Sequence, residues 1–387
     1  MSVTAPRGFR AAGVTAGLKP SGRPDVALVV NDGPTDVVAA VVTSNRCRAA
    51  PVLWSEVVAR GGRGRAVVLN SGGANCYTGP EGFATTHATA ERVGELLGCG
   101  AGEVVVCSTG LIGEQLDRPR LLAGVDAAAA ALTADGGHDA AVAVMTTDTR
   151  PKEAVQVRAG GTDGWSCGGM AKGAGMLAPA LATMLVVLTT DAVVGAADAD
   201  AALRAATAAT FDRLDSDGCQ STNDTVVLLA SGASGVGVGA DELAGALTPL
   251  CADLAAQLLG DAEGSEHDIA ITVERAASEA DALEVARSVA RSNLFKAAVF
   301  GRDPNWGRVM AAVGTTTAAF DPAVLDVSFN GVQVCRDGGV GEPRDLVDLS
   351  ARAVEVVVDL KEGRARATVR TNDLTHAYVH ENSAYST

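Results

Sequence analysis

The sequence predicts a layered α/β or α+β fold, and three observations support this fold class. Short apolar runs typical of strands alternate with longer segments of helical periodicity along the 387 residues. Apolar residues make up 47% of the chain and aromatic residues only 3%, so the core must be packed from small aliphatic side chains. No long Pro-, Ser- or Gly-rich linker divides the chain, which indicates one integrated unit.

The strand predictions rest on runs rich in Val, Ile and Thr that are bounded by turn residues. They cover residues 25–30, 37–44, 66–70, 103–108, 225–230, 268–273, 325–331 and 364–371. The helix predictions rest on apolar residues that recur every three or four positions. They cover residues 86–98, 118–134, 199–214, 241–260 and 279–300.

Charge and composition exclude several classes of protein. The formal net charge of −15 argues against a nucleic-acid-binding surface, which needs an excess of Lys and Arg. The longest apolar runs are too short to span a membrane, and residues 1–13 lack the hydrophobic run of a signal peptide. The eight cysteines are scattered and form no Cys-x-x-Cys pair, which is typical of reduced, inert thiols. We therefore expect a cytoplasmic protein.

No metal site or cofactor is expected from the sequence. The five histidines form no H-E-x-x-H motif. His376 and His380 are four residues apart and would share one face of a helix, but no third ligand stands nearby in the sequence. A capping or solvated pair explains them better than a metal centre.

Several polar loops are richer in Gly, Asn, Ser and Thr than a simple reversal of the chain requires. NSGGANCYTG (70–79) and CSTGLIGE (107–114) each follow a predicted strand directly. Thr109 and Gly110 could direct successive backbone N–H groups at an anion or an oxyanion, since Gly allows close approach of the backbone. An ordinary turn is the alternative for both loops. For RDPNWGRV (302–309), the start of a helix is a better interpretation than a functional loop. The polar tail HENSAYST (380–387) would ordinarily be expected to fray.

Thr183 stands at the edge of an apolar run in the stretch KGAGMLAPALATMLVVLTTDA (172–192). A β-branched residue in a core strand is its simplest explanation. The chemical alternative requires that the bond between Ala182 and Thr183 be cut. Thr183 would then carry both a hydroxyl nucleophile and a free α-amine, which has an unperturbed pKa of roughly 7.7–8.0 and can act as its base. Such chemistry needs no histidine.

Eight motifs in matching order, over essentially the whole chain, resemble the ornithine acetyltransferase family, the glutamate N-acetyltransferases of arginine biosynthesis. They are NSGGANCYTG, CSTGLIG, MTTDTRPKE (145–153), the K-G-x-G-M to A-T-M-L block (172–185), STNDT (221–225), DAEG (261–264), DPNWGRV (303–309) and ENSAYST (381–387).

The resemblance implies a precursor that cuts itself between Ala182 and Thr183. The products would be an α chain of residues 1–182 and a β chain of residues 183–387, which form one catalytic unit and assemble as a cytoplasmic α2β2 heterotetramer. The implied fold is an αββα-type sandwich built from two α/β substructures. Thr183 would take the acetyl group of N2-acetyl-L-ornithine and pass it to L-glutamate by ping-pong transfer, without nucleic acid, membrane, metal or bound cofactor.

The resemblance also implies the roles of individual residues. Thr109 and Gly110 match the oxyanion hole. The positions that match substrate contacts are Thr146, Lys172, Thr183, Glu263, Asn382 and Thr387. Lys172 suits the α-carboxylate of both amino acids, while Glu263 suits the ornithine side-chain amine or a proton transfer near Thr183. The sequence departs from many relatives at Gly73, Ala180 and His267.

Alternatives remain at this point. Some relatives also accept acetyl-CoA, but the sequence shows no CoA-binding signature. Aminopeptidases that share this fold also cleave themselves, although usually with Ser as the new N-terminus, so an amide hydrolase is the second interpretation. A binding protein that is never cleaved is the third, and the intact Thr183, Thr109-Gly110 and Lys172 argue against it.

Overall fold

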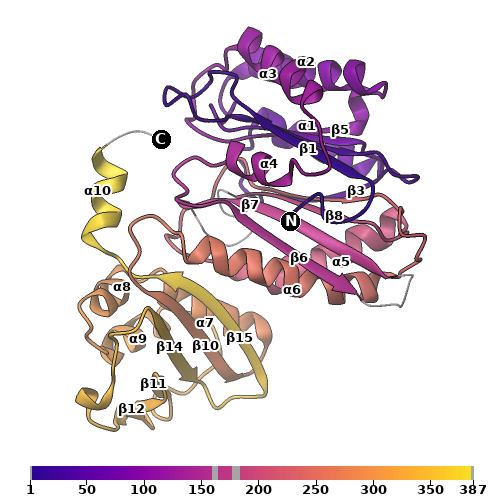
Figure 1. Ribbon diagram of the computed structural model, residues 1–387. Helices are drawn as coiled ribbons and strands as arrows, with labels where there is room; N and C mark the ends of the chain where they lie inside the picture. The colour runs from indigo at the N-terminus through magenta and orange to yellow at the C-terminus, as the bar shows by residue number, and fades with distance from the viewer. Residues whose placement is uncertain (1, 159–163, 177–183, 385–387) are drawn as a thin grey trace.

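A computed structural model describes residues 2–158, 164–176 and 184–384. The chain forms a larger lobe, which contains the N-terminus, and a smaller lobe built from the last third of the sequence (Figure 1). Two sheets stack in the larger lobe and a third sheet forms the smaller one.

The first sheet of the larger lobe has four strands in the order β1-β2-β4-β5. Only β4 and β5 run parallel; the other neighbours are antiparallel. The strands are β1 (Phe9–Val14), β2 (Val26–Asn31), β4 (Ala66–Asn70) and β5 (Val104–Ser108). Three of them are buried along their whole length, so they carry Val and Leu on both faces.

The second sheet has five strands in the order β3-β9-β8-β7-β6, of which β8 and β9 run parallel. The strands are β3 (Val37–Val42), β6 (Lys152–Arg158), β7 (Trp165–Lys172), β8 (Leu185–Thr190) and β9 (Thr225–Ala230). β7 is antiparallel to β8, so the end of β7 and the start of β8 lie at the same edge of the sheet.

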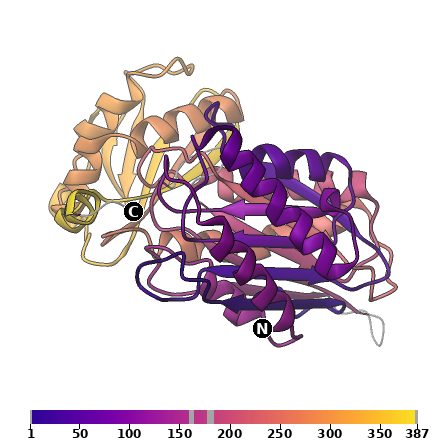
Figure 2. The ribbon, with the colours of Figure 1, turned by 90° about the horizontal axis from the view of Figure 1, so that it is seen from above.

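The two sheets pack face to face between two layers of helices. Val67 and Val105 of the first sheet share a core with Val187 and Val227 of the second. Separate cores cover the outer faces, where two helices pack on each sheet (Figures 1 and 2). They are α2 (Gly79–Leu97) and α3 (Arg118–Ala130) on the first sheet, and α5 (Ala196–Ala209) and α6 (Ala240–Leu259) on the second. This arrangement is the predicted αββα sandwich, which is confirmed.

Two shorter helices complete the larger lobe. α1 (Ala50–Arg60) contacts β3 and β5, and α4 (Gly137–Ala143) contacts β1, β2 and β7. Each therefore touches both sheets and helps to close the core between them.

The smaller lobe is a six-stranded sheet with helices on one face. The order is β13-β12-β11-β14-β10-β15, with only β10 and β14 parallel. The strands are β10 (Asp268–Ala276), β11 (Asp326–Phe329), β12 (Val332–Arg336), β13 (Gly339–Val340), β14 (Ala353–Asp359) and β15 (Ala365–Asn372). Its helices are α7 (Glu279–Ala290), α8 (Asn293–Phe300) and α9 (Trp306–Val313), which bury one core against the sheet.

All eight predicted strands and all five predicted helical segments contain the expected element. The segment 279–300 was predicted as one helix and forms two, because Ser292 caps a new helix by accepting the N–H of Phe295. The helix start predicted at DPNWGRV is confirmed by α9, which Asn305 caps. β1, β6, β7, β12, β13, β14, α1 and α4 were not predicted.

The polar C-terminal segment is helical over much of its length. α10 (His376–Ala384) follows β15 and projects from the smaller lobe (Figure 1). The expectation of fraying is therefore wrong for residues 380–384. No helix in the described ranges is long and apolar enough to cross a membrane.

Candidate active site

Lys172 is the centre of the candidate site. It is the last residue of β7, and its side chain is only 2% exposed. Its Nζ donates to the hydroxyl Oγ1 of Thr146 at 2.7 Å and lies 3.3 Å from the hydroxyl of Thr109. Burial lowers the pKa of Lys172, and the carboxylate of Asp148 opposes this effect. Three of the predicted site residues thus meet around one buried ammonium group.

Asp148 organises this centre although the sequence analysis did not select it. Its Oδ1 accepts the N–H of Gly173 at 2.7 Å and the ammonium of Lys152 at 2.6 Å, and its Oδ2 accepts the N–H of Thr146 at 2.9 Å. Burial alone would raise the pKa of Asp148, but Lys172 and Lys152 outweigh it and lower the pKa to about 2. The carboxylate is therefore ionised and fixes the geometry around Lys172.

The predicted oxyanion pair lies where β5 ends. Gly110 adopts a φ of +131°, and a Cβ there would lie 2.8 Å from the backbone of Gly73, so only glycine fits. The possibility that both backbone N–H groups point at an anion does not hold for Thr109, whose N–H donates to the carbonyl of Asn70 at 3.0 Å. The N–H of Gly110 has no hydrogen-bond partner among the described residues. The donors available here are therefore the Gly110 N–H and the Thr109 hydroxyl.

The STNDT motif joins the two loops of the first sheet to the start of β8. The Asn223 amide donates to the carbonyls of Ala74 at 2.6 Å and Ser108 at 2.8 Å. The next residue, Asp224, is fully buried and accepts the N–H of Met184 at 3.0 Å. Burial raises the pKa of Asp224 well above its usual range. This carboxyl group holds the residue that follows Thr183 in the chain.

Glu263 and Asn382 form a second group at the other end of the segment 172–175. The Asn382 amide donates to the Glu263 carboxylate at 3.0 Å. The backbone N–H of Glu263 donates to the carbonyl of Ala174 at 3.0 Å, and a Cβ on Gly175 would lie 2.7 Å from its carboxylate. The segment between Lys172 and Gly175 therefore runs from the first group to the second.

Three predicted positions lie outside the described residues. They are Ala182 and Thr183, which form the predicted cleavage site, and Thr387. The division into chains 1–182 and 183–387 stays a prediction.

Two of the three positions that depart from the family pattern, Gly73 and His267, lie in different surroundings in the structure. A Cβ on Gly73 would lie 3.0 Å from Leu116, so a side chain there requires some adjustment. His267 is buried, with Nδ1 at 2.7 Å from the Asp373 carboxylate and Nε2 at 3.2 Å from the Leu349 carbonyl. This histidine is a packed, hydrogen-bonded residue of the smaller lobe. Ala180 lies outside the described residues.

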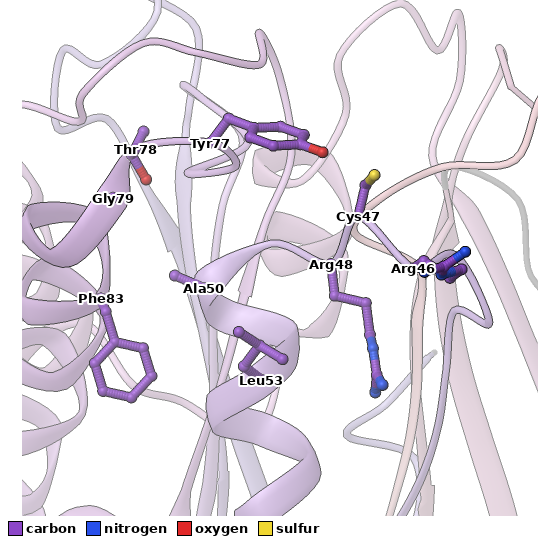
Figure 3. A pocket seen from close by; sticks show the side chains of 9 residues that line it. All are labelled: Arg46, Cys47, Arg48, Ala50, Leu53, Tyr77, Thr78, Gly79 and Phe83. Atoms are coloured by element: carbon purple, nitrogen blue, oxygen red, sulfur yellow. The ribbon is translucent and has the colours of Figure 1, made fainter.

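One surface pocket has none of the predicted site residues in its lining. A pocket of about 310 Å³ opens where α1 and α2 begin (Figure 3). Tyr77, Cys47 and Arg46 line part of it, and the Tyr77 ring extends toward Cys47 (Figure 3). Within residues 2–158, 164–176 and 184–384, no group of three or more His, Cys, Asp or Glu side chains is arranged to hold a metal ion.

Asp148 and Asp224 are functional candidates that sequence reasoning missed. Both belong to quoted motifs, MTTDTRPKE and STNDT. The available signal was an acidic residue inside a Thr-rich motif that ends or begins next to a strand. The sequence could not show that both carboxyl groups are buried, nor which backbone groups they hold.

Comparison with known proteins identifies the family. A family model described as the ArgJ family matches residues 10–387. The arginine biosynthesis bifunctional protein ArgJ of Streptomyces coelicolor is 61% identical over 386 residues and covers 100% of both chains. The protein of the same name from Thermobifida fusca is 60% identical over 387 residues, again with 100% of both chains covered. A solved structure of ornithine acetyltransferase complexed with ornithine, from Mycobacterium tuberculosis, is 53% identical over 48% of this chain and 96% of that chain, with a TM-score of 0.45. The family model and the two full-length relatives confirm the resemblance seen in the eight motifs, and the chain belongs to the ArgJ family.

Proposed function

We propose that this chain is an acyltransferase of arginine biosynthesis that moves an acetyl group from N2-acetyl-L-ornithine to L-glutamate. Its relatives over the whole length are named as arginine biosynthesis proteins. This family assignment favours acetyl transfer over the amide hydrolase alternative. The structural observation that carries the proposal is the buried Lys172 ammonium, which bridges the hydroxyl groups of Thr109 and Thr146.

The first half-reaction starts at Thr183, after cleavage has exposed its α-amine. The Thr183 hydroxyl oxygen attacks the acetyl carbonyl carbon while the hydroxyl proton passes to this amine. The bond between the carbonyl carbon and the ornithine nitrogen then breaks, and the proton moves to that nitrogen. The products are ornithine and an acetyl ester on Thr183.

The second half-reaction returns the enzyme to its starting state. The amino nitrogen of glutamate attacks the ester carbonyl, the bond to the Thr183 oxygen breaks, and a proton from the amine returns to that oxygen. An oxyanion forms in both half-reactions. The Thr109 hydroxyl and the Gly110 N–H are the donors assigned to it, and the loss of one such donor typically costs about 2.7–4 kcal/mol.

Processing and assembly belong to the same proposal. The precursor cuts itself between Ala182 and Thr183, and the two chains assemble as α2β2. A cytoplasmic location is supported by all eight cysteines being free thiols, as expected for a reducing compartment. The relatives are named bifunctional, and acetyl-CoA is the second donor to test.

The test begins with a denaturing gel of the mature protein. Two bands of 182 and 205 residues are expected, the larger starting at Thr183 with Thr-Met-Leu-Val. Thr183→Ala is expected to abolish both cleavage and transfer, whereas Thr183→Ser keeps part of each because it retains a hydroxyl group and an amine. A fully active Thr183→Ala protein would overturn the mechanism. Release of acetate and ornithine alone, in the presence of glutamate, would favour the hydrolase.

A further inference from the structure

The loop between β1 and β2, residues 15–25, is held rigidly against the candidate site. The buried carboxylate of Asp25 accepts the backbone N–H groups of Leu18 at 2.6 Å and Lys19 at 3.0 Å. Leu18 packs so closely on Gly72 that a Cβ added to Gly72 would lie 2.2 Å from the Leu18 Cβ. Gly72 belongs to the NSGGANCYTG loop, so the position of loop 15–25 is fixed relative to the oxyanion pair.

Two cations of this loop reach the backbone next to Lys172. The Lys19 Nζ donates to the carbonyl of Met145 at 2.6 Å and to that of Pro24 at 2.9 Å. The Arg23 Nη2 donates to the carbonyl of Thr146 at 3.2 Å. Thr146 is the residue whose hydroxyl accepts from the Lys172 ammonium.

The positive charges of Lys19 and Arg23 are not neutralised by contact with a carboxylate among the described residues. Neither Lys19 nor Arg23 forms an ion pair with a carboxylate in the described part of the chain. Burial, together with Arg23 and Lys172, lowers the pKa of Lys19 to about 8, although Asp25 and Asp148 act in the opposite direction. An anion bound beside Lys19 would relieve this repulsion, so the loop offers a favourable place for a carboxylate.

We propose that Lys19 and Arg23 bind the side-chain carboxylate of glutamate, the acetyl acceptor. This inference rests on the proposed function, since it concerns the second half-reaction. Both substrates have an α-carboxylate, but only glutamate has a second carboxylate. The side chain of acetylornithine ends instead in an ammonium group, for which Glu263 lies at the far end of the Lys172–Gly175 segment. The side-chain carboxylate of glutamate points toward Lys19 and Arg23, and the side-chain ammonium group of acetylornithine points toward Glu263 on the other side of the site.

The inference is tested by measuring each half-reaction separately in four variants. Lys19→Gln and Arg23→Gln each remove one cation and keep a polar side chain, and Lys19→Arg restores the charge. Arg204→Gln is the matched control, because Arg204 pairs with Asp200 on the exposed surface of α5. Exchange of labelled ornithine into acetylornithine reports the first half-reaction alone. Acetyl transfer to glutamate and to glutamine, whose side chain is neutral, reports the second.

Lys19→Gln and Arg23→Gln are expected to lower kcat/KM for glutamate by about 10- to 100-fold, the effect of losing one charged hydrogen bond. The loss should appear mainly in KM, and transfer to glutamine and ornithine exchange should stay within about twofold of the control. Lys19→Arg should recover most of the loss. Equal losses for glutamate and glutamine, or a loss of ornithine exchange in step with glutamate transfer, would overturn the inference. Absence of ornithine exchange in the mature wild-type protein would instead contradict the proposed function.

Discussion

Replacement of Asp148 by Asn tests whether a buried carboxylate holds the candidate site together. Asp148 lies between two buried ammonium groups, at 2.6 Å from the Lys152 Nζ and 4.0 Å from the Lys172 Nζ. Lys152 keeps a second carboxylate partner, Asp261, also at 2.6 Å. Lys172 has no other carboxylate within ion-pair distance in the described ranges, so it loses its nearest counter-charge in Asp148→Asn.

The expected magnitude follows from the pKa of the carboxyl group. It falls from an ordinary value of 3.8 to about 2 in the folded protein. This difference in proton affinity corresponds to about 2.4 kcal/mol of stability at pH 6. Because the pKa is lower in the folded state, this stability is present above pH 3.8 and is lost as the pH falls through 2. At pH 2 the same pKa difference contributes only about 0.4 kcal/mol to the stability of the folded protein.

The assay compares the free energies of unfolding of wild type and Asp148→Asn by denaturant titration between pH 6 and pH 2. The difference between the two proteins should be about 2–4 kcal/mol at pH 6, since Lys172 is also left unpaired, and should shrink by about 2 kcal/mol toward pH 2. Asp200→Asn is the control, because its exposed pair with Arg204 should contribute less than about 1 kcal/mol at any pH. A difference that is constant across this pH range would refute the assignment of an ionised Asp148.

Three further predictions concern single residues. Gly110→Ala should lower the rate of acetyl transfer by about 10²- to 10³-fold, because the added Cβ would lie 2.8 Å from Gly73 and displace the oxyanion donor. Its circular dichroism spectrum should match that of wild type. Wild-type turnover in this variant would contradict the assignment. Asp224→Asn should melt no lower than wild type at pH 8. The raised pKa of Asp224 makes its ionisation costlier in the folded state than in the unfolded state, so wild type loses stability as the pH rises. A variant that becomes progressively less stable than wild type from pH 5 to pH 8 would show that the pKa of Asp224 is lowered instead. His267→Leu should lose about 3 kcal/mol, because one oxygen of the buried Asp373 carboxylate loses its ring partner while the other keeps two backbone N–H groups. His267→Lys should retain most of the stability in the same denaturation assay. Equal stability of the two variants would argue against this buried contact.

Strands that are buried on both faces were predictable from the sequence. The run TVVLLA (225–230) is one example, since all six residues of β9 are buried and its neighbours on both sides are strands. β7 was missed because its sequence, WSCGGMAK, has two glycines and low strand propensity. The structure explains Gly168: a Cβ there would lie 2.2 Å from the carbonyl oxygen of Ser2. The close approach of Ser2 therefore requires glycine at position 168, and no local sequence pattern reveals such a tertiary contact.

The motifs identified the residues of the site, but the sequence did not reveal how they pair. Asp148 and Lys172 are brought together by the antiparallel pairing of β6 and β7, in which Lys152 lies opposite Ala171. This register aligns residues that are about twenty positions apart in the chain, and no local pattern specifies it. The same limit applies to Asp224, whose contact with Met184 depends on the parallel pairing of β8 with β9.

Charge balance explains how two buried ammonium groups can lie next to the proposed substrate positions. The buried ammonium groups of Lys152 and Lys172 are matched by two carboxylates, those of Asp148 and Asp261, which leaves the interior close to neutral. Bound substrate therefore meets the charges that stay uncompensated outside this cluster, which are Lys19 and Arg23 at one end and Glu263 at the other. Since the α-nitrogens of acetylornithine and glutamate both bond to the same acetyl carbon beside Thr183, the two substrates differ chiefly in where their side chains point. Opposite charges at the two ends let one nucleophile serve both substrates without moving.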